Sequence, residues 1–97
     1  MQIEEKRNQI DAIDEAILDL LNRRAAIAKD ISLIKLSAGL PIADLQREDE
    51  VLRRLAQANL GLIEDTAVAR IYRIILDESC RIQANVRAEL AANGASR

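Results

Sequence analysis

The first glycine of the chain is Gly39 and no proline precedes it, so nothing interrupts a helix over the preceding residues. Within this stretch aliphatic side chains recur at intervals of seven, in two rows three residues apart. The first row holds Ile3, Ile10, Ile17 and Ile31, and the second holds Ile13, Leu20, Ile27 and Ile34. Such rows make the apolar face of one long helix, at about 3–37. At about 1.5 Å per residue this helix reaches about 50 Å.

A helix of this length exceeds what the rest of the chain can cover. The chain has 97 residues, and its aliphatic core lacks Phe and Trp and holds a single Tyr. A compact domain of about one hundred residues has a radius of gyration of only about 13 Å. Two shorter helices leave much of such a rod open to water, and a core this thin is marginal for a monomer. We therefore expect a homodimer in which the long helices pack together.

The remaining glycine and proline residues divide the rest of the chain into two shorter helices, at about 44–59 and 65–92. Asp44 is a good N-cap for the first of them, because its side chain accepts from a main-chain N–H of the first turn. No stretch alternates apolar and polar residues as a half-buried strand does. The sequence therefore predicts an all-α fold, a single domain over 1–97 with three helices per protomer and a very long first helix.

Composition excludes several classes of function. The net charge is −2, histidine is absent and there is one cysteine. One cysteine rules out an intrachain disulfide, and with no histidine and one cysteine a zinc site of the usual ligand types is excluded too. An acidic chain without a basic run is a poor nucleic-acid binder, and no apolar run reaches the ~20 residues of a membrane span. The polar N-terminus is unlike a signal peptide, so we expect a cytoplasmic protein. We also expect no metal and no cofactor.

Polar residues interrupt the apolar rows at a few positions. Arg24 stands where the first row calls for an aliphatic residue, and Arg7 and Lys35 lie in the row beside it. In the third predicted helix Ser79 and Gln83 break the apolar face. A buried cation without a counter-charge costs several kcal/mol, so either protein carboxylates or a ligand anion must neutralise these side chains.

Each polar break also has a plain structural explanation. Arg24 can extend its charged end to water, Lys35 suits a helix C-terminus, and Ser79 can bond back to a helical carbonyl. Gln83 can set the register of a bundle. Taken singly these explanations are the better ones, but together the cations on one helix face and the breaks in another favour an anion site.

Helical spacing limits which cations can share one ligand. Arg24 and Lys35 are eleven residues apart, about 16 Å along a helix, so their long side chains can reach one small molecule. Arg7 and Arg24 are about 25 Å apart, too far for that. Arg7 can join the site only from a partner chain, which an antiparallel pairing of the long helices allows.

Three segments resemble a known family, the all-helical AroQ class (type II) of chorismate mutases. They are RNQIDAIDEAILDLLNRRAAIAKDISLIK, PIADLQREDEVL and IYRIILDESCRIQ. The resemblance covers about residues 3–88 and implies an intertwined homodimer with two equivalent sites. It implies an isomerase of aromatic amino acid biosynthesis (the shikimate pathway), which converts chorismate to prephenate by a Claisen rearrangement.

The resemblance also implies roles for single residues. Arg7 matches an arginine supplied by the partner chain, and Arg24 and Ser79 match ligands of a substrate carboxylate. Lys35 matches a lysine that contacts the ether oxygen and a carboxylate, and Gln83 matches a donor to the same ether oxygen.

The second predicted helix supplies the other matching positions. Asp44 matches a residue whose main chain helps to bind the substrate hydroxyl, Arg47 one that lines the site, and Glu48 the carboxylate that accepts from the hydroxyl. The resemblance thus implies eight substrate-binding residues, of which four are catalytic: Arg24, Lys35, Glu48 and Gln83.

Two other functions remain open from the sequence. Isochorismate pyruvate lyases share this fold and also place a lysine and a glutamine near an ether oxygen, although Glu48 and the loop PIADLQRE favour the mutase. A non-catalytic helical dimer, acting in regulation or interaction, explains the aliphatic residues at intervals of seven but not the polar residues that interrupt them.

Overall fold

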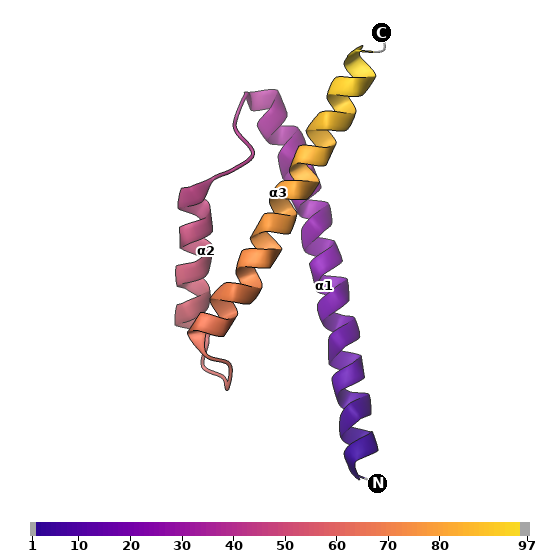
Figure 1. Ribbon diagram of the computed structural model, residues 1–97, viewed down its shortest axis with the longest axis vertical. Helices are drawn as coiled ribbons and strands as arrows, with labels where there is room; N and C mark the ends of the chain where they lie inside the picture. The colour runs from indigo at the N-terminus through magenta and orange to yellow at the C-terminus, as the bar shows by residue number, and fades with distance from the viewer. Residues whose placement is uncertain (1, 96–97) are drawn as a thin grey trace.

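The computed structural model describes residues 2–95 and consists of three helices (Figure 1). They are α1 (Gln2–Ala38), α2 (Leu45–Ala58) and α3 (Asp65–Ala95). No residue between 2 and 95 lies in a strand. The all-α prediction with a very long first helix is therefore confirmed, and α3 continues beyond its predicted end at about 92.

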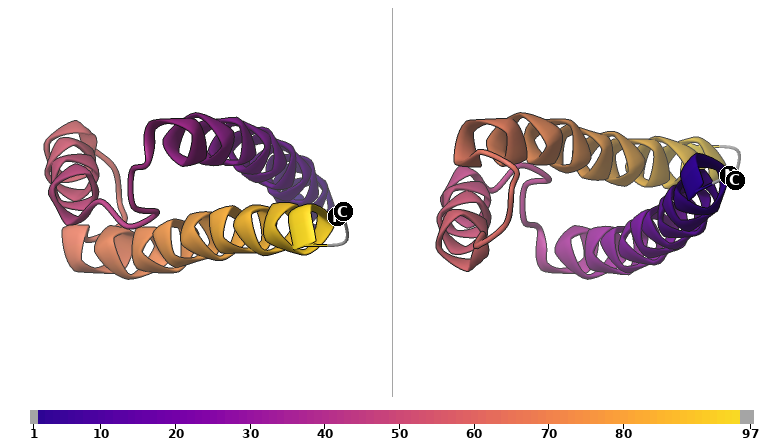
Figure 2. Two further views of the ribbon diagram at one scale, coloured as in Figure 1. Left: turned by 90° about the horizontal axis from the view of Figure 1, so that it is seen from above. Right: turned by 90° about the horizontal axis from the view of Figure 1, so that it is seen from below.

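The two long helices cross, and the short one packs beside α3 (Figure 1). Seen from either end, α1 and α2 lie to the same side of α3, apart from one another (Figure 2). The described chain measures 62 × 29 × 16 Å and has a radius of gyration of 17.5 Å, well above the ~13 Å of a compact chain of this size. The protomer is therefore an open, elongated body.

The core is small and lies where the helices meet. Its buried apolar residues are Ala28, Val51, Leu76 and Val86. Ser32 is fully buried, and its hydroxyl donates to the Lys29 carbonyl at 2.6 Å. Small side chains on α1 let the two backbones approach closely at the crossing. In contrast, every side chain from residue 2 to residue 23 is exposed.

A glycine turn ends α1 and directs the chain toward α2. Gly39 has φ +70°, a conformation that favours glycine. The N–H of Gly39 donates to the Leu36 carbonyl at 3.2 Å, and that of Leu40 to the Lys35 carbonyl at 2.8 Å. These are the two bonds of a Schellman C-cap. The helix end therefore has its carbonyls satisfied, and the chain leaves it in a defined direction.

The start of α2 has the predicted cap. The Asp44 carboxylate accepts from the Arg47 N–H at 3.0 Å, which satisfies one of the free N–H groups of the first turn. Of the helices described, none is both long and apolar enough to cross a membrane.

Candidate functional site

Of the predicted site residues other than Arg7, the structure brings Arg24, Arg47 and Ser79 to one cavity and Lys35 to Gln83, whereas Asp44 and Glu48 do not line that cavity. Arg24 and Lys35 come from α1 and Ser79 and Gln83 from α3. The others belong to the first turn of α2 or its cap: Asp44, Arg47 and Glu48. Arg7 lies near the far end of α1, where it is exposed and pairs with Glu4 at 2.9 Å.

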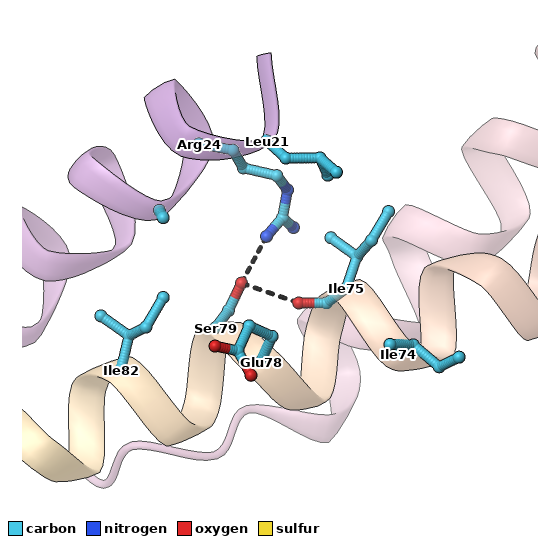
Figure 3. A pocket seen from close by; sticks show the side chains of 8 residues that line it. Leu21, Arg24, Ile74, Ile75, Glu78, Ser79 and Ile82 are labelled. Atoms are coloured by element: carbon cyan, nitrogen blue, oxygen red, sulfur yellow. Dashed lines mark hydrogen bonds between the residues drawn. The ribbon is translucent and has the colours of Figure 1, made fainter. Parts of the chain in front are cut away.

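The Arg24 guanidinium reaches across from α1 to α3 and donates to the Ser79 hydroxyl (Figure 3). That hydroxyl donates in turn to the Ile75 carbonyl at 3.1 Å. Ser79 thus bonds back to its own helix, as the structural explanation anticipated, and still accepts from a cation. Because its proton is used on Ile75, its oxygen is oriented toward Arg24, and the other Arg24 N–H groups stay available for an anion.

Lys35 and Gln83 form a second polar contact between the same helices. The Lys35 ammonium donates to Gln83 Oε1 at 3.2 Å and to the Ile42 carbonyl at 2.7 Å. Gln83 is only 6% exposed. An ammonium has three N–H donors and these acceptors take two. The pair therefore presents one ammonium N–H and the Gln83 amide NH₂ as donors for a ligand.

The carboxylate of Glu48 is held from α3. Arg73 Nη2 donates to Glu48 Oε1 at 3.3 Å, and the same guanidinium lies 4.0 Å from Asp77. The Glu48 side chain is 14% exposed, against 46% for Arg73. Arg73 was missed by the sequence analysis, because only its i,i+4 spacing to Asp77 is visible along the chain. Its contact with Glu48 joins residues twenty-five positions apart.

A cavity of about 250 Å³ lies between the three helices. Its polar lining comes from Arg24, Arg47 and Ser79, and its apolar lining from Ile27, Ala28, Ile31, Val51 and Leu76. A few polar groups in an apolar wall are typical of a small-molecule site. Arg47 itself pairs with Glu50 at 3.6 Å and is exposed.

A second cavity, of about 170 Å³, lies beside the Arg24–Ser79 contact (Figure 3). Apart from those two residues its lining is almost wholly apolar: Leu21, Ala25, Ile74, Ile75 and Ile82 with Glu78. Hydrogen bonding to Arg81 lowers the pKa of Glu78 and raises the pKa of Arg81. Glu78 pairs with Arg81 and forms no ion pair with Arg24 within residues 2–95.

The electrostatics of the crossing favour an anion. Within residues 2–95 neither Arg24 nor Lys35 forms an ion pair with a carboxylate. Both side chains are half-buried and bond only to neutral acceptors. A partly desolvated cation is stabilised by a counter-charge, and carboxylates suit arginine because its planar fork can donate two bonds. No cluster of metal-ligating side chains occurs in the described chain.

Comparisons with known proteins point to one family. The family model for chorismate mutase type II matches residues 6–84. A chorismate mutase of Methanocaldococcus jannaschii is 31% identical over 83 residues, covering 84% of each chain. The crystal structure of chorismate mutase from Helicobacter pylori in complex with prephenate superposes with a TM-score of 0.83, at 34% identity over 90% of this chain and 94% of that one.

Other relatives are longer than this chain. A bifunctional chorismate mutase/prephenate dehydratase of Aquifex aeolicus is 37% identical over 90 residues, which are 89% of this chain and 25% of that protein. The chain thus spans about a quarter of the length of such bifunctional relatives.

Proposed function

The chain belongs to the chorismate mutase type II family, and on this premise we propose that it catalyses the rearrangement of chorismate to prephenate. The observation that carries the proposal is the pair of half-buried cations, Arg24 and Lys35, neither of which has a neutralising carboxylate within residues 2–95. Arg24 lines a cavity, and Lys35 bonds to the buried amide of Gln83. Chorismate is a dianion whose ether bond breaks in the reaction, so it needs both anion binding and donors at one oxygen.

Arg24 and Ser79 hold a substrate carboxylate in this proposal. Ser79 keeps the guanidinium in place, and the remaining N–H groups of Arg24 grip the anion. Arg47 supports the opposite wall of the same cavity. Holding both ends of the substrate enforces the folded conformer from which the new C–C bond forms, and this restriction lowers the barrier.

Lys35 and Gln83 act on the breaking C–O bond. As that bond lengthens, negative charge grows on the ether oxygen, and preorganised donors stabilise it more than they stabilise the ground state. In this proposal Lys35 also contacts a carboxylate of the substrate. The rearrangement is unimolecular: one C–O bond breaks and one C–C bond forms within the same molecule. It therefore requires no nucleophile or general base from the protein.

The substrate hydroxyl is assigned to the start of α2. Glu48 accepts a hydrogen bond from it, and Arg73 holds the carboxylate in place. The Asp44 carboxylate accepts from the Arg47 N–H and its carbonyl accepts from the Glu48 N–H, which leaves the Asp44 main-chain N–H for the hydroxyl.

We further propose that the protein is a homodimer in which Arg7 enters the partner's site. The support is the exposed apolar face of α1, with Ile10 57% and Ile17 50% accessible. Large apolar patches on a small soluble chain mark interaction surfaces. Arg7 lies about 25 Å along α1 from Arg24, so only an antiparallel second copy brings such a side chain to the cavity.

The test is product identification. The purified protein is incubated with chorismate and, separately, with isochorismate. We expect prephenate from chorismate at an enzymatic rate. Pyruvate and salicylate from isochorismate, with only feeble prephenate formation, would instead identify a lyase, and no turnover of either by a folded dimer would favour a non-catalytic role.

A binding measurement separates the site from the chemistry. A dicarboxylate mimic of the transition state should raise the melting temperature, since a ligand at one hundred times its Kd stabilises the native state by about 2.7 kcal/mol. Arg24→Ala should abolish the shift. The matched control is Arg23→Ala, the adjacent exposed arginine that pairs only with Asp19 at 3.9 Å, and it should keep the shift.

A further inference from the structure

We propose that Arg87 is a positioning residue, which fixes the α1–α2 connection from α3 and thereby aims the Lys35 ammonium at the reacting bond. This inference rests on the proposed function. It adds to the site a residue that lies outside the cavity and touches no substrate.

The connection between α1 and α2 needs an anchor. Helix α2 packs on α3, whereas its backbone does not approach that of α1 closely in the described chain. The placement of α2 relative to the end of α1 therefore depends on residues 39–44. Apolar burial holds this segment weakly, because Leu40 is 52% exposed and Pro41 is exposed as well. Hydrogen bonds must supply most of its order.

Two cations hold the connection from opposite sides. Arg87 Nη2 on α3 donates to the Leu40 carbonyl. Two residues further along, the Ile42 carbonyl accepts from Lys35 Nζ on α1 at 2.7 Å. The Leu40 N–H is bonded to the Lys35 carbonyl at 2.8 Å. Lys35 is thus tied to the connection through both its main chain and its side chain, and Arg87 ties the connection to α3.

Arg87 contributes little to the stability of the fold. It is half-buried, and its Nε is buried without a hydrogen-bond partner. It forms no ion pair within residues 2–95. The desolvation of a guanidinium and an unpaired N–H offsets much of what one bond to a carbonyl contributes. What the bond does determine is geometry, since it sets the distance between α3 and the Leu40 carbonyl.

The geometry matters because Lys35 has little else to orient it. Its other acceptor is Gln83 Oε1 at 3.2 Å, one helical turn before Arg87 on the same face of α3. Gln83 and Arg87 therefore place the two acceptors of Lys35 from a single rigid helix, Gln83 directly and Arg87 through residues 40–42. Release of Leu40 lets the Ile42 carbonyl move, and the ammonium then loses its fixed direction toward the ether oxygen.

The first experiment compares Arg87→Met with Arg87→Lys. Methionine keeps the apolar stem and removes every donor, whereas lysine keeps one charged donor. We expect Arg87→Met to lower kcat by roughly tenfold or more, the scale of one charged hydrogen bond, with KM changed by less than about threefold. Arg87→Lys should recover most of the lost kcat. Equal losses in the two variants, or a loss confined to KM, would overturn the proposal.

The second experiment asks whether Arg87 acts through Lys35. In a Lys35→Ala background, Arg87→Met should reduce kcat no further, because the group that it orients is gone. Arg54→Met is the matched control, since Arg54 is exposed on α2 and has no hydrogen-bond or ion-pair partner among residues 2–95, and it should leave kcat unchanged. Additive losses in the double variant would refute an effect transmitted by Lys35.

A third measurement does not depend on activity. Amide hydrogen exchange in a peptide covering residues 36–43 should be faster in Arg87→Met than in the wild type, and unchanged in peptides from the N-terminal half of α1. Unchanged exchange in 36–43 would overturn the anchoring role even if kcat fell. If the wild type converts no chorismate, the proposed function fails, and the exchange result still decides whether Arg87 holds the connection.

Discussion

At the scale of single residues, the cations that have a bonding partner fall into two groups. Most of them form ion pairs on the surface with residues three or four positions away, such as Arg81 with Glu78 and Arg23 with Asp19. Arg24 and Lys35 instead bond to a hydroxyl, a carbonyl and an amide oxygen. Surface pairs contribute little to stability, whereas half-buried cations without counter-charge are poised to bind an anion.

Lys35→Ala should lose far more activity than stability. The lost bonds to Ile42 and Gln83 have a charged donor and are worth about 1.5–3 kcal/mol each, but the substitution also removes the desolvation cost of a half-buried ammonium, which offsets much of that loss in folding. Removal of a donor from the transition state raises the barrier by about 2.7–4 kcal/mol, or a hundredfold or more in kcat. Steady-state kinetics and urea unfolding of the same preparation measure both effects. Near-normal turnover by a folded Lys35→Ala protein would contradict the assignment.

Gln83→Glu should make activity depend on acid. Glutamate has an ordinary pKa of about 4.3, and a neighbouring ammonium favours its ionised form. The carboxylate can accept from Lys35 but cannot donate to the ether oxygen. Activity should therefore be present at low pH and vanish as pH rises through the pKa of the new carboxyl. The pH dependence of kcat checks this, with wild type as the control, and a variant as active as wild type at neutral pH would refute the donor role.

At the scale of elements, the two ends of α1 differ in how they pack. Its C-terminal third carries the crossing with α3, through Ala28 and the fully buried Ser32. In its N-terminal part, residues 2–23, every side chain is exposed. The turn after the crossing then decides where α2 begins. Because Gly39 adopts φ +70°, this turn depends on a residue without a side chain.

The same substitution should have opposite effects at two glycines. Gly39→Ala forces an L side chain into the left-handed region and should destabilise the protein by about 1 kcal/mol. Gly94→Ala lies within α3, meets no neighbouring atom, and should be neutral or stabilising by up to about 1 kcal/mol. Urea unfolding at fixed protein concentration measures both. Equal stability of the two variants would argue against a strained turn at Gly39.

At the scale of the whole molecule, the described chain is open and elongated, which supports the proposed homodimer. Its radius of gyration is 17.5 Å, and the large apolar side chains of α1 are exposed over most of the helix. The cavity beside Arg24 and Ser79 is apolar and lies on the same helix pair. In the proposed homodimer, a second copy that packs against α1 covers this surface and carries its Arg7 toward Arg24.

Mixed dimers test the shared site. Arg7→Ala and Arg24→Ala should each be nearly inactive as homodimers, because every site then lacks one arginine. When differently tagged copies of the two variants are combined, one site of each mixed dimer regains both arginines, so about half of the wild-type activity should return. A mixed dimer of verified composition that recovers nothing would exclude a site shared in this way.

The helices and their ends were predictable because they depend on local chemistry. Isoleucine recurs at intervals of seven, and no helix breaker precedes Gly39. The Asp44 carboxylate caps an N–H only three residues away. Each of these signals acts between residues that are close in the sequence. The same locality explains why the polar breaks at Arg24 and Ser79 could be recognised as exceptions to an apolar face.

The contacts across the crossing came only from the tertiary structure. Arg24 meets Ser79 over fifty-five residues, Arg87 meets Leu40 over forty-seven, and Arg73 meets Glu48 over twenty-five. No spacing along one helix encodes such pairs, because they depend on where two helices cross and on the direction that the turn at Gly39 imposes. The sequence by itself therefore determined which elements form and which side chains break their faces. The crossing of α1 and α3 decided which of those side chains face one another, since a hydrogen bond acts over about 3 Å and only packing brings distant residues that close.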